Sequence, residues 1–190
     1  YVIINYSNDD NAAAQLEDEA KEYEGRFSII KEKLSDYEAA ISFAQKVKGI
    51  IEHIDCIVFN CGMTDRSAFC DISRESWEQV MNTNLNVPLY ILQYLNDSLN
   101  PGGKIIFIGS ILGIYPHASS LGYAVSKAAV HQMAKELVKV FADRCITVNA
   151  IASGFVDTPW QSTKPKEQKK RIEEKIALKR FGYPEEIANL

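Results

Sequence analysis

Short apolar runs alternate along the chain with longer stretches in which apolar residues recur at helical spacing. The short runs are rich in β-branched residues, which is typical of buried strands. We predict strands at residues 1–5, 28–34, 54–59, 104–109 and 146–151. The longer stretches predict helices at residues 10–24, 74–99 and 122–142, and the Pro-Gly-Gly sequence at 101–103 predicts a turn. Strands that alternate with helices are typical of an α/β fold with a parallel sheet.

One segment carries the candidate chemistry. Ser110 follows the strand at 104–109, and ligands of open α/β sheets bind at the carboxyl ends of strands. Tyr123 and Lys127 lie four residues apart in the next predicted helix, so they share one face. A lysine ammonium one turn away is expected to lower the pKa of the phenol from its usual value near ~10. The phenol then suits general acid catalysis on a carbonyl/alcohol couple, with Ser110 as a hydrogen-bond donor to the substrate oxygen.

The Tyr-x-x-x-Lys motif alone has a plainer interpretation, a surface pair on an ordinary helix, because short motifs recur by chance. Further motifs, however, stand in order along the chain. They are Asn60-Cys61-Gly62 after a predicted strand, Asn84 within a helix, the set Ser110, Tyr123 and Lys127, and residues 148–158 with Ser153, Gly154, Val156 and Thr158. Together they resemble the motifs of the short-chain dehydrogenase/reductase family, in particular its bacterial 3-oxoacyl-(acyl carrier protein) reductases.

The resemblance implies a doubly wound parallel sheet of the Rossmann type, formed by residues 1–190 as a single domain. It implies reversible hydride transfer between NADP(H) and a carbonyl or secondary alcohol. The first candidate substrate is a 3-oxoacyl thioester, either a small molecule or linked to a carrier. An NAD-dependent dehydrogenase of a steroid, sugar or small alcohol is the alternative. A non-catalytic protein that senses the cofactor would share the fold, but the complete Ser–Tyr–Lys set argues against it.

The same resemblance assigns four catalytic residues. Tyr123 is the general acid in reduction, Lys127 also binds the nicotinamide ribose, and Ser110 polarises the carbonyl. Asn84 holds a water that links Lys127 to solvent. The sequence supports this last role, because Pro88 has no N–H and the Asn84 carbonyl therefore lacks its helical partner. A helix kink without catalytic meaning is the alternative.

The residues at the end of the first predicted strand indicate whether the protein prefers NADP or NAD. An acidic residue there would bind the ribose 2′-hydroxyl of NAD and repel a 2′-phosphate. Asn5 and the three residues after it are neutral, so we expect NADP, with NAD as the alternative. The expected cofactor-binding residues are Asn5, Asn60, Cys61, Gly62, Tyr123, Lys127, Ser153, Gly154, Val156 and Thr158, and the expected substrate-binding residues are Ser110, Tyr123 and Trp160. Cys61 replaces an alanine common in the family; we expect an inert thiol, and a redox-sensitive site is the weaker alternative.

Two pieces of the family pattern do not occur in this sequence. One is the first strand–helix unit, whose Gly-x3-Gly-x-Gly turn holds the cofactor pyrophosphate. The other is the last strand, which in the family follows the region of residues 186–190. The absent first strand would lie between the strands at 1–5 and 54–59. We therefore expect the working protein to have further residues, and residues 1–190 alone to bind dinucleotide poorly.

Residues 159–180 are polar and helical in parts, and in the family this region is a mobile lid over the substrate. Trp160 provides an apolar wall there. Residues 164–180 contain eight basic and three acidic side chains, although the whole chain carries a net charge of −4. A solvated helix face is the plainer interpretation of this charge. Attraction for an acidic carrier or a phosphate-bearing substrate is the sharper one.

Composition limits the remaining classes of function. The net charge argues against nucleic acid as a partner, and no apolar run reaches the length needed to span a membrane. The four cysteines have no Cys-x-x-Cys spacing and the three histidines are scattered, so we expect a cytoplasmic protein without a metal site. We expect His131 at a helix surface or interface. The helices at 74–99 and 122–142 carry more apolar residues than one sheet face can cover, which predicts a homodimer or homotetramer.

Overall fold

The computed structural model describes residues 1–23, 25–116, 120–162 and 164–190. The strands of this part of the chain are β1 (Val2–Tyr6), β2 (Phe27–Lys31), β3 (Ile54–Phe59), β4 (Leu99–Ile108) and β5 (Thr147–Ile151). Its α-helices are α1 (Asp10–Glu19), α2 (Tyr37–Ile50), α3 (Arg74–Met81), α4 (Val87–Leu95), α5 (Leu121–Phe141), α6 (Lys166–Glu173) and α7 (Pro184–Ala188). β1 pairs with β2, and β3, β4 and β5 form a second sheet in that order. All of these pairs are parallel, so the predicted α/β fold is confirmed.

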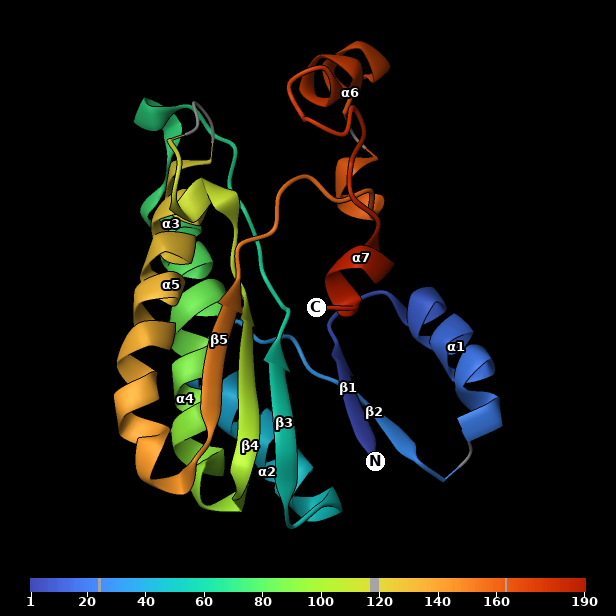
Figure 1. Ribbon diagram of the computed structural model, residues 1–190, viewed down its shortest axis with the longest axis vertical. Coiled ribbons are helices and arrows are strands. Elements are labelled where there is room, and N and C mark those ends of the chain that lie inside the picture. Colours follow the sequence, from blue (N-terminus) through green and yellow to red (C-terminus); the bar gives the residue numbers. More distant parts are fainter. Residues whose placement is uncertain (24, 117–119, 163) are drawn as a thin grey trace.

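Helices lie on both sides of the strands, as in a doubly wound sheet (Figure 1). α4 and α5 cover one face of the β3–β4–β5 sheet, and α2 packs against α4. α1 lies on the other side of the molecule, beyond β1 and β2. α6 lies past the carboxyl ends of the strands, which is where a lid over a ligand site belongs.

The hydrophobic core fills the space between α4, α5 and the facing side of β4. Its most deeply buried members on these elements are Val87, Ile91, Leu92, Leu95, Leu99, Ile105, Phe107, Val130, Ala134 and Phe141. The Phe107 ring stacks on the Phe59 ring of β3 with 5.0 Å between centroids. This packing holds α5 firmly against β4, and it therefore fixes the position of the side chains that α5 carries at its amino-terminal end.

The opposite face of β3 is open. Val58 is 53% exposed, although it belongs to a strand that the sequence predicts as buried. Within the described residues β1 and β3 do not pair with each other, and Figure 1 shows them as neighbours. The expectation that a further strand fits between them stays a prediction.

The turn predicted at residues 101–103 is wrong, because this segment belongs to β4. Gly102 has a φ of +78°, which a side chain would strain, and the pairing of β3 with β4 shifts register near the start of β3. A Cβ at Gly103 would lie 2.9 Å from the Asn100 carbonyl oxygen and 3.1 Å from the Asp55 carbonyl oxygen. The glycines therefore allow an irregularity within a strand and do not connect two elements.

Three other predicted elements differ from the structure by more than one residue at an end. The strand predicted at 28–34 ends at Lys31. The helix predicted at 10–24 becomes α1 followed by a 3₁₀ turn at Ala20–Tyr23, and residue 24 lies outside the described residues. The helix predicted at 74–99 is divided by a π-helical turn at Asn82–Asn86, and its last residue begins β4. A π-helical turn within a helix often marks a functional site.

Candidate active site

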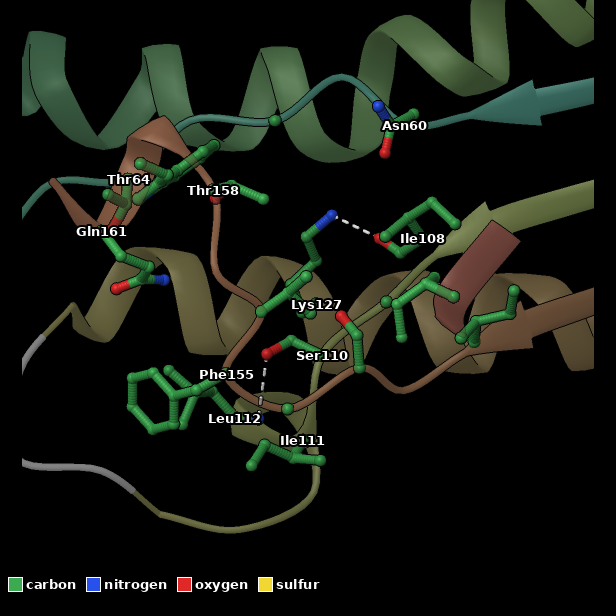
Figure 2. Close-up of a pocket in the computed structure, with 18 of the residues that line it drawn as sticks. Asn60, Thr64, Ile108, Ser110, Ile111, Leu112, Lys127, Phe155, Thr158 and Gln161 are labelled. Atoms are coloured by element: carbon green, nitrogen blue, oxygen red, sulfur yellow. Dashed lines mark hydrogen bonds between the residues drawn. The ribbon is translucent and has the colours of Figure 1, made fainter. Parts of the chain in front are cut away.

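An open cavity of about 1200 Å³ lies at the carboxyl ends of β3, β4 and β5 (Figure 2). The predicted site residues that line it are Asn60, Cys61, Gly62, Ser110, Tyr123, Lys127, Ser153, Gly154, Val156, Thr158 and Trp160. They come from segments far apart in the sequence, and the common direction of the strands brings them to one edge. Asn5 and Asn84, which we also predicted in the site, are not part of the cavity lining.

Ser110 follows β4 closely and is held by its backbone neighbours. Its Oγ accepts a hydrogen bond from the Leu112 N–H at 3.1 Å (Figure 2), and its carbonyl accepts one from the Gly113 N–H at 3.0 Å. The Ile111 N–H donates to the Ser153 carbonyl at 2.9 Å, which joins this turn to the loop after β5. The serine is 6% exposed, so its hydroxyl is a fixed feature of the cavity wall.

Lys127 lies in α5, one helical turn beyond Tyr123, and is 4% exposed. Its Nζ donates a hydrogen bond to the Ile108 carbonyl at 2.6 Å (Figure 2). The same atom lies 5.6 Å from the centre of the Tyr123 ring. The structure therefore places the ammonium between the end of β4 and the phenol.

Burial shifts the pKa of both residues. It lowers the pKa of Lys127 to about 8, with a smaller opposing effect from Cys61. It raises the pKa of Tyr123, while a hydrogen bond with the Ser110 hydroxyl acts in the opposite direction. The expected lowering of the Tyr123 pKa by Lys127 is not found, because the ammonium donates to a backbone carbonyl instead of the phenol. At neutral pH Tyr123 keeps its proton, which is the form in which a phenol acts as an acid.

The buried ammonium makes a testable contribution to stability. Between pH 8 and the ordinary lysine value of 10.5, the unfolded chain holds a proton on Lys127 that the folded chain has lost. The free energy of unfolding attributable to this residue should therefore rise with pH, by about 2 kcal/mol between pH 7 and pH 10. Urea unfolding of the wild type and of Lys127→Met at both pH values measures the difference.

The exposed Lys135 of the same helix provides the control for this measurement. Replacing it with methionine removes the same charge from a solvated position, so its effect on unfolding should change little over the same range. Equal pH responses of the two variants would mean that burial does not penalise the charge of Lys127.

Asn84 lies behind the cavity wall, in the π-helical turn, and is 2% exposed. Its Oδ1 accepts a hydrogen bond from the Met63 N–H at 2.8 Å. Its Nδ2 donates to the Met63 carbonyl at 2.9 Å and to Ser126 Oγ at 2.8 Å. The side chain thus connects the loop after β3 to α5. Pro88 lies four residues farther on, and the role of the Asn84 carbonyl in holding a relay water stays a prediction.

Asn5, at the end of β1, is turned toward β2. Its Nδ2 donates to the Ile30 and Glu32 carbonyls at 3.2 and 3.0 Å. Its Oδ1 accepts a hydrogen bond from Cys61 Sγ at 3.5 Å, a contact between β1 and the loop after β3. Burial raises the pKa of the Cys61 thiol, and Lys127 acts against this shift. The raised pKa favours the inert thiol over the redox-sensitive one.

Trp160 brings the predicted lid next to the candidate catalytic residues. Its ring lies 6.3 Å from the ring of Tyr123, at an interplanar angle of 59°. The two ends of the segment that carries Trp160 lie side by side, because Val156 and Gly182 form a parallel bridge. That residues 159–180 move as a lid stays a prediction.

Sequence reasoning missed several residues that line the cavity. They are Thr64 and Arg66 in the loop after β3, Leu112 and Phe155 near the strand ends, and Gln161 and Lys164 in the predicted lid. Burial lowers the pKa of Lys164, and Arg66 and Lys169 act in the same direction. Arg66 could have been predicted in the site from its position four residues after Gly62, because we expected Asn60, Cys61 and Gly62 to bind the cofactor.

Comparison with known proteins identifies the family. Residues 1–190 match the family model described as Enoyl-(Acyl carrier protein) reductase. The 3-oxoacyl-[acyl-carrier-protein] reductase FabG of Thermotoga maritima is 33% identical over 180 residues, which cover 86% of this chain and 72% of the relative. The FabG of Aquifex aeolicus is 30% identical over 194 positions, which cover 100% and 77%. The Pseudomonas aeruginosa RhlG/NADP active-site complex is 28% identical, with a TM-score of 0.88 over 98% of this chain and 76% of that one.

The chain belongs to the short-chain dehydrogenase/reductase family. As a short-chain dehydrogenase/reductase it is an NAD(P)-dependent oxidoreductase. Among the residues that the structure describes, every helix is too short or too polar to cross a membrane. The same residues contain no group of three or more His, Cys, Asp or Glu side chains able to hold a metal ion.

Apart from Asn5, all the residues that we predicted to bind the cofactor line this cavity of the short-chain dehydrogenase/reductase. A Cβ at Gly62 would lie 3.4 Å from Asn84 Oδ1 and 3.7 Å from Lys127 Nζ, so the glycine leaves space beside these candidate catalytic residues. Ser153 and Thr158 line the side of the cavity formed by the chain after β5. Residues 1–190 contain no Gly-x3-Gly-x-Gly turn, so the pyrophosphate half of the cofactor has no cradle of that kind within them.

Proposed function

We propose that this protein reduces a carbonyl group with NADPH and that a 3-oxoacyl thioester is its substrate. The observation that carries the proposal is the convergence of Ser110, Tyr123 and Lys127 on one cavity at the carboxyl end of the sheet. Each side chain is held by packing or hydrogen bonds before any ligand binds, as an efficient catalytic group requires.

Tyr123 supplies the proton in this proposal. The substrate oxygen accepts hydrogen bonds from the hydroxyls of Tyr123 and Ser110, which line the same cavity. Bound NADPH provides the hydride that the carbonyl carbon accepts. As negative charge develops on the oxygen, the Tyr123 phenol transfers its proton and the Ser110 hydroxyl stabilises the charge. The raised pKa of Tyr123 keeps this proton on the phenol at neutral pH.

Lys127 stabilises the phenolate that proton transfer leaves on Tyr123. Its ammonium lies 5.6 Å from the ring centre, and a pKa of about 8 keeps it mostly protonated at neutral pH. The attraction between opposite charges favours the phenolate at that moment of the reaction. A water on the Asn84 carbonyl would then return a proton from solvent. Lys127 would also hold the nicotinamide ribose.

NADP is the proposed cofactor because residues 5–8, at the end of β1, are all uncharged. Asn5 replaces the acidic residue that would bind the ribose 2′-hydroxyl of NAD and repel a phosphate. The P. aeruginosa relative of known structure was solved as an NADP complex, which supports the same choice. NAD is the alternative, and the assay below includes it.

A 3-oxoacyl thioester is proposed because the two FabG relatives reduce a substrate of that name and the site suits a carbonyl. The family model is described as an enoyl reductase, so a 2-enoyl thioester is the natural comparator. The enoyl compound has a carbon–carbon double bond and no oxygen at the reacting carbon. The hydroxyls of Ser110 and Tyr123 would then have no acceptor at that position, which favours the 3-oxo compound.

The test measures NADPH oxidation by the full-length protein with a 3-oxoacyl thioester, the matching 2-enoyl thioester and a small neutral ketone. We expect the highest kcat/KM for the 3-oxoacyl thioester, and lower values when NADH replaces NADPH. Turnover of the enoyl thioester alone would reverse the substrate assignment. Tight NADPH binding by calorimetry without reduction of any carbonyl would indicate a binding protein.

The positive charge of residues 164–180, in the predicted lid, provides a second test of the substrate. Lys170 and Arg171 are exposed on α6, so an acidic carrier can approach them. If the substrate is linked to such a carrier, kcat/KM should fall as ionic strength rises, whereas the neutral ketone should respond little. Changing both residues to glutamate should reproduce the loss for the carrier-linked substrate only. Reversal of the exposed Lys33 and Lys139, which lie outside the cavity, is the control, and equal effects of the two pairs would rule out recognition by lid charge.

We also infer that the protein is a cytoplasmic homodimer or homotetramer. Leu121, Val125 and Val138 on α5 are 44%, 39% and 47% exposed, which leaves apolar area for a second copy to cover. Sedimentation of the full-length protein as a monomer at micromolar concentration would contradict the assembly.

A further inference from the structure

His131 contacts the candidate catalytic serine from behind. It lies on α5, one helical turn beyond Lys127, and is half-buried instead of lying on an open helix surface. Its Nε2 accepts a hydrogen bond from the Ser110 N–H at 3.2 Å. The residue does not line the cavity, so it acts on the site only through its neighbours.

Gly109 provides the space that this contact needs. A Cβ at Gly109 would lie 2.1 Å from His131 Nε2 and 2.6 Å from His131 Cδ2, distances that no pair of atoms tolerates. The imidazole therefore packs directly against the backbone that leads from β4 into Ser110. The Ile151 carbonyl oxygen, 3.1 Å from the same Cβ position, closes the other side. The imidazole thus occupies the space that a side chain at residue 109 would need.

The contact with His131 differs in kind from the other hydrogen bonds that hold Ser110. The bonds from Leu112 and Gly113 come from the same turn, so they shape the turn but do not place it. The bond to His131 ties the serine to α5, and α5 is also the helix that carries Tyr123 and Lys127. This bond therefore helps to set the separation between the serine and the tyrosine, together with the packing of Gly113 against α5.

The hydrogen bond requires a neutral imidazole. Nε2 accepts only when its lone pair is free, so the ring proton must be on Nδ1, and an imidazolium cannot accept. The charged groups that act on the ring are Lys127 and Lys135, both on α5 itself, and they and burial lower the pKa of His131. From β4 the ring meets Gly109, and the nearest atom of β5 to that glycine is the Ile151 carbonyl oxygen; neither group titrates. The acceptor form is thus favoured at neutral pH.

We infer that His131 is a positioning residue for the reduction: its neutral imidazole accepts the Ser110 N–H and sets the serine hydroxyl against Tyr123. The inference rests on the proposed function, because it gives His131 a role only through a catalytic Ser110.

The test replaces His131 with methionine or glutamine, in the wild type and in Ser110→Ala. Methionine fills similar space without an acceptor for the N–H, whereas the glutamine Oε1 can reach it. We expect His131→Met to lower kcat about tenfold, the effect of one well-placed hydrogen bond, with little change in the KM for NADPH. His131→Gln should restore most of this loss.

Ser110→Ala is the informative background because it keeps the N–H and removes only the hydroxyl. There His131→Met should cause no further loss of kcat, since no serine hydroxyl remains to be positioned. An equal loss in both backgrounds, or no loss in the wild type, would overturn the inference. If Ser110→Ala itself leaves kcat unchanged, the proposed role of the serine fails, and that result is distinct from a failure of His131 alone.

The acid limb of the kcat–pH profile provides an independent test if the His131→Met protein folds poorly. The wild type should lose kcat as the imidazole gains a proton and releases the serine N–H, because an imidazolium has no lone pair. His131→Gln cannot gain that proton, so this decline should be absent from its profile. Identical acid limbs in the two proteins would also overturn the inference.

Discussion

Replacing Tyr123 with phenylalanine is expected to lower turnover by about 10²–10⁴-fold, the usual contribution of a general acid. The change removes the proton that the carbonyl oxygen must receive and keeps the ring, which lies 6.3 Å from the Trp160 ring. Affinity for the cofactor should change little because the packing around the ring is preserved. Steady-state kinetics with a 3-oxoacyl thioester and calorimetry with NADPH measure the two quantities.

Tyr115→Phe is the matched control for this experiment. Tyr115 follows the same serine-bearing turn, but it is 66% exposed and does not line the cavity. Its replacement removes the same hydroxyl and should leave turnover unchanged. A Tyr123→Phe protein that keeps most of its activity with every carbonyl substrate would show that the proton comes from elsewhere.

Gly113→Ala is expected to destabilise the protein by about 2–3 kcal/mol, the upper part of the usual range for overpacking. A Cβ at Gly113 would lie 2.7 Å from the backbone nitrogen of Ala128 and 2.7 Å from the carbonyl carbon of Lys127. These are backbone atoms within a helix, so they cannot turn aside as a flexible side chain would. Either the turn after Ser110 or the helix must move, and activity should fall with stability. Urea unfolding and kcat at a temperature where the variant is folded measure both effects.

Gly49→Ala separates the effect of crowding from the general effect of a glycine replacement. Gly49 lies near the end of α2, and a Cβ there would meet no atom within 4 Å. Alanine favours a helix over glycine, so this variant should gain stability, by up to about 1 kcal/mol. If both replacements stabilised the protein, the close approach of the serine-bearing turn to α5 would not be a constraint.

The strands and the convergence of Ser110, Tyr123 and Lys127 on one cavity were predictable because each depends on a local pattern. An apolar run gave β3 its correct bounds, and the four-residue spacing of Tyr123 and Lys127 placed both on one face of α5. The serine could be assigned to the same edge because parallel strands end together. These inferences need only periodicity and the direction of the strands.

Features that depend on contacts between distant segments could not be predicted. Nothing near His131 in the sequence indicates that its ring meets the backbone of Gly109, because that contact exists only once α5 packs on β4. The prediction that Lys127 lowers the pKa of Tyr123 was wrong for a similar reason. The nearest partner of Lys127 is the Ile108 carbonyl, and its burial follows from the fold and not from its neighbours in the helix.

The bridge between Val156 and Gly182 has a consequence for how this enzyme can acquire new substrates. The Asp157 N–H donates to the Gly182 carbonyl at 2.8 Å, and the Gly182 N–H donates to the Phe155 carbonyl at 2.9 Å. The intervening segment is therefore a closed loop, and doubling the length of such a loop costs only about 0.6 kcal/mol. Insertions or exchanges there can reshape the wall that carries Trp160 without moving Ser110, Tyr123 or Lys127. Substrate range and chemistry are thus free to evolve on separate parts of the chain.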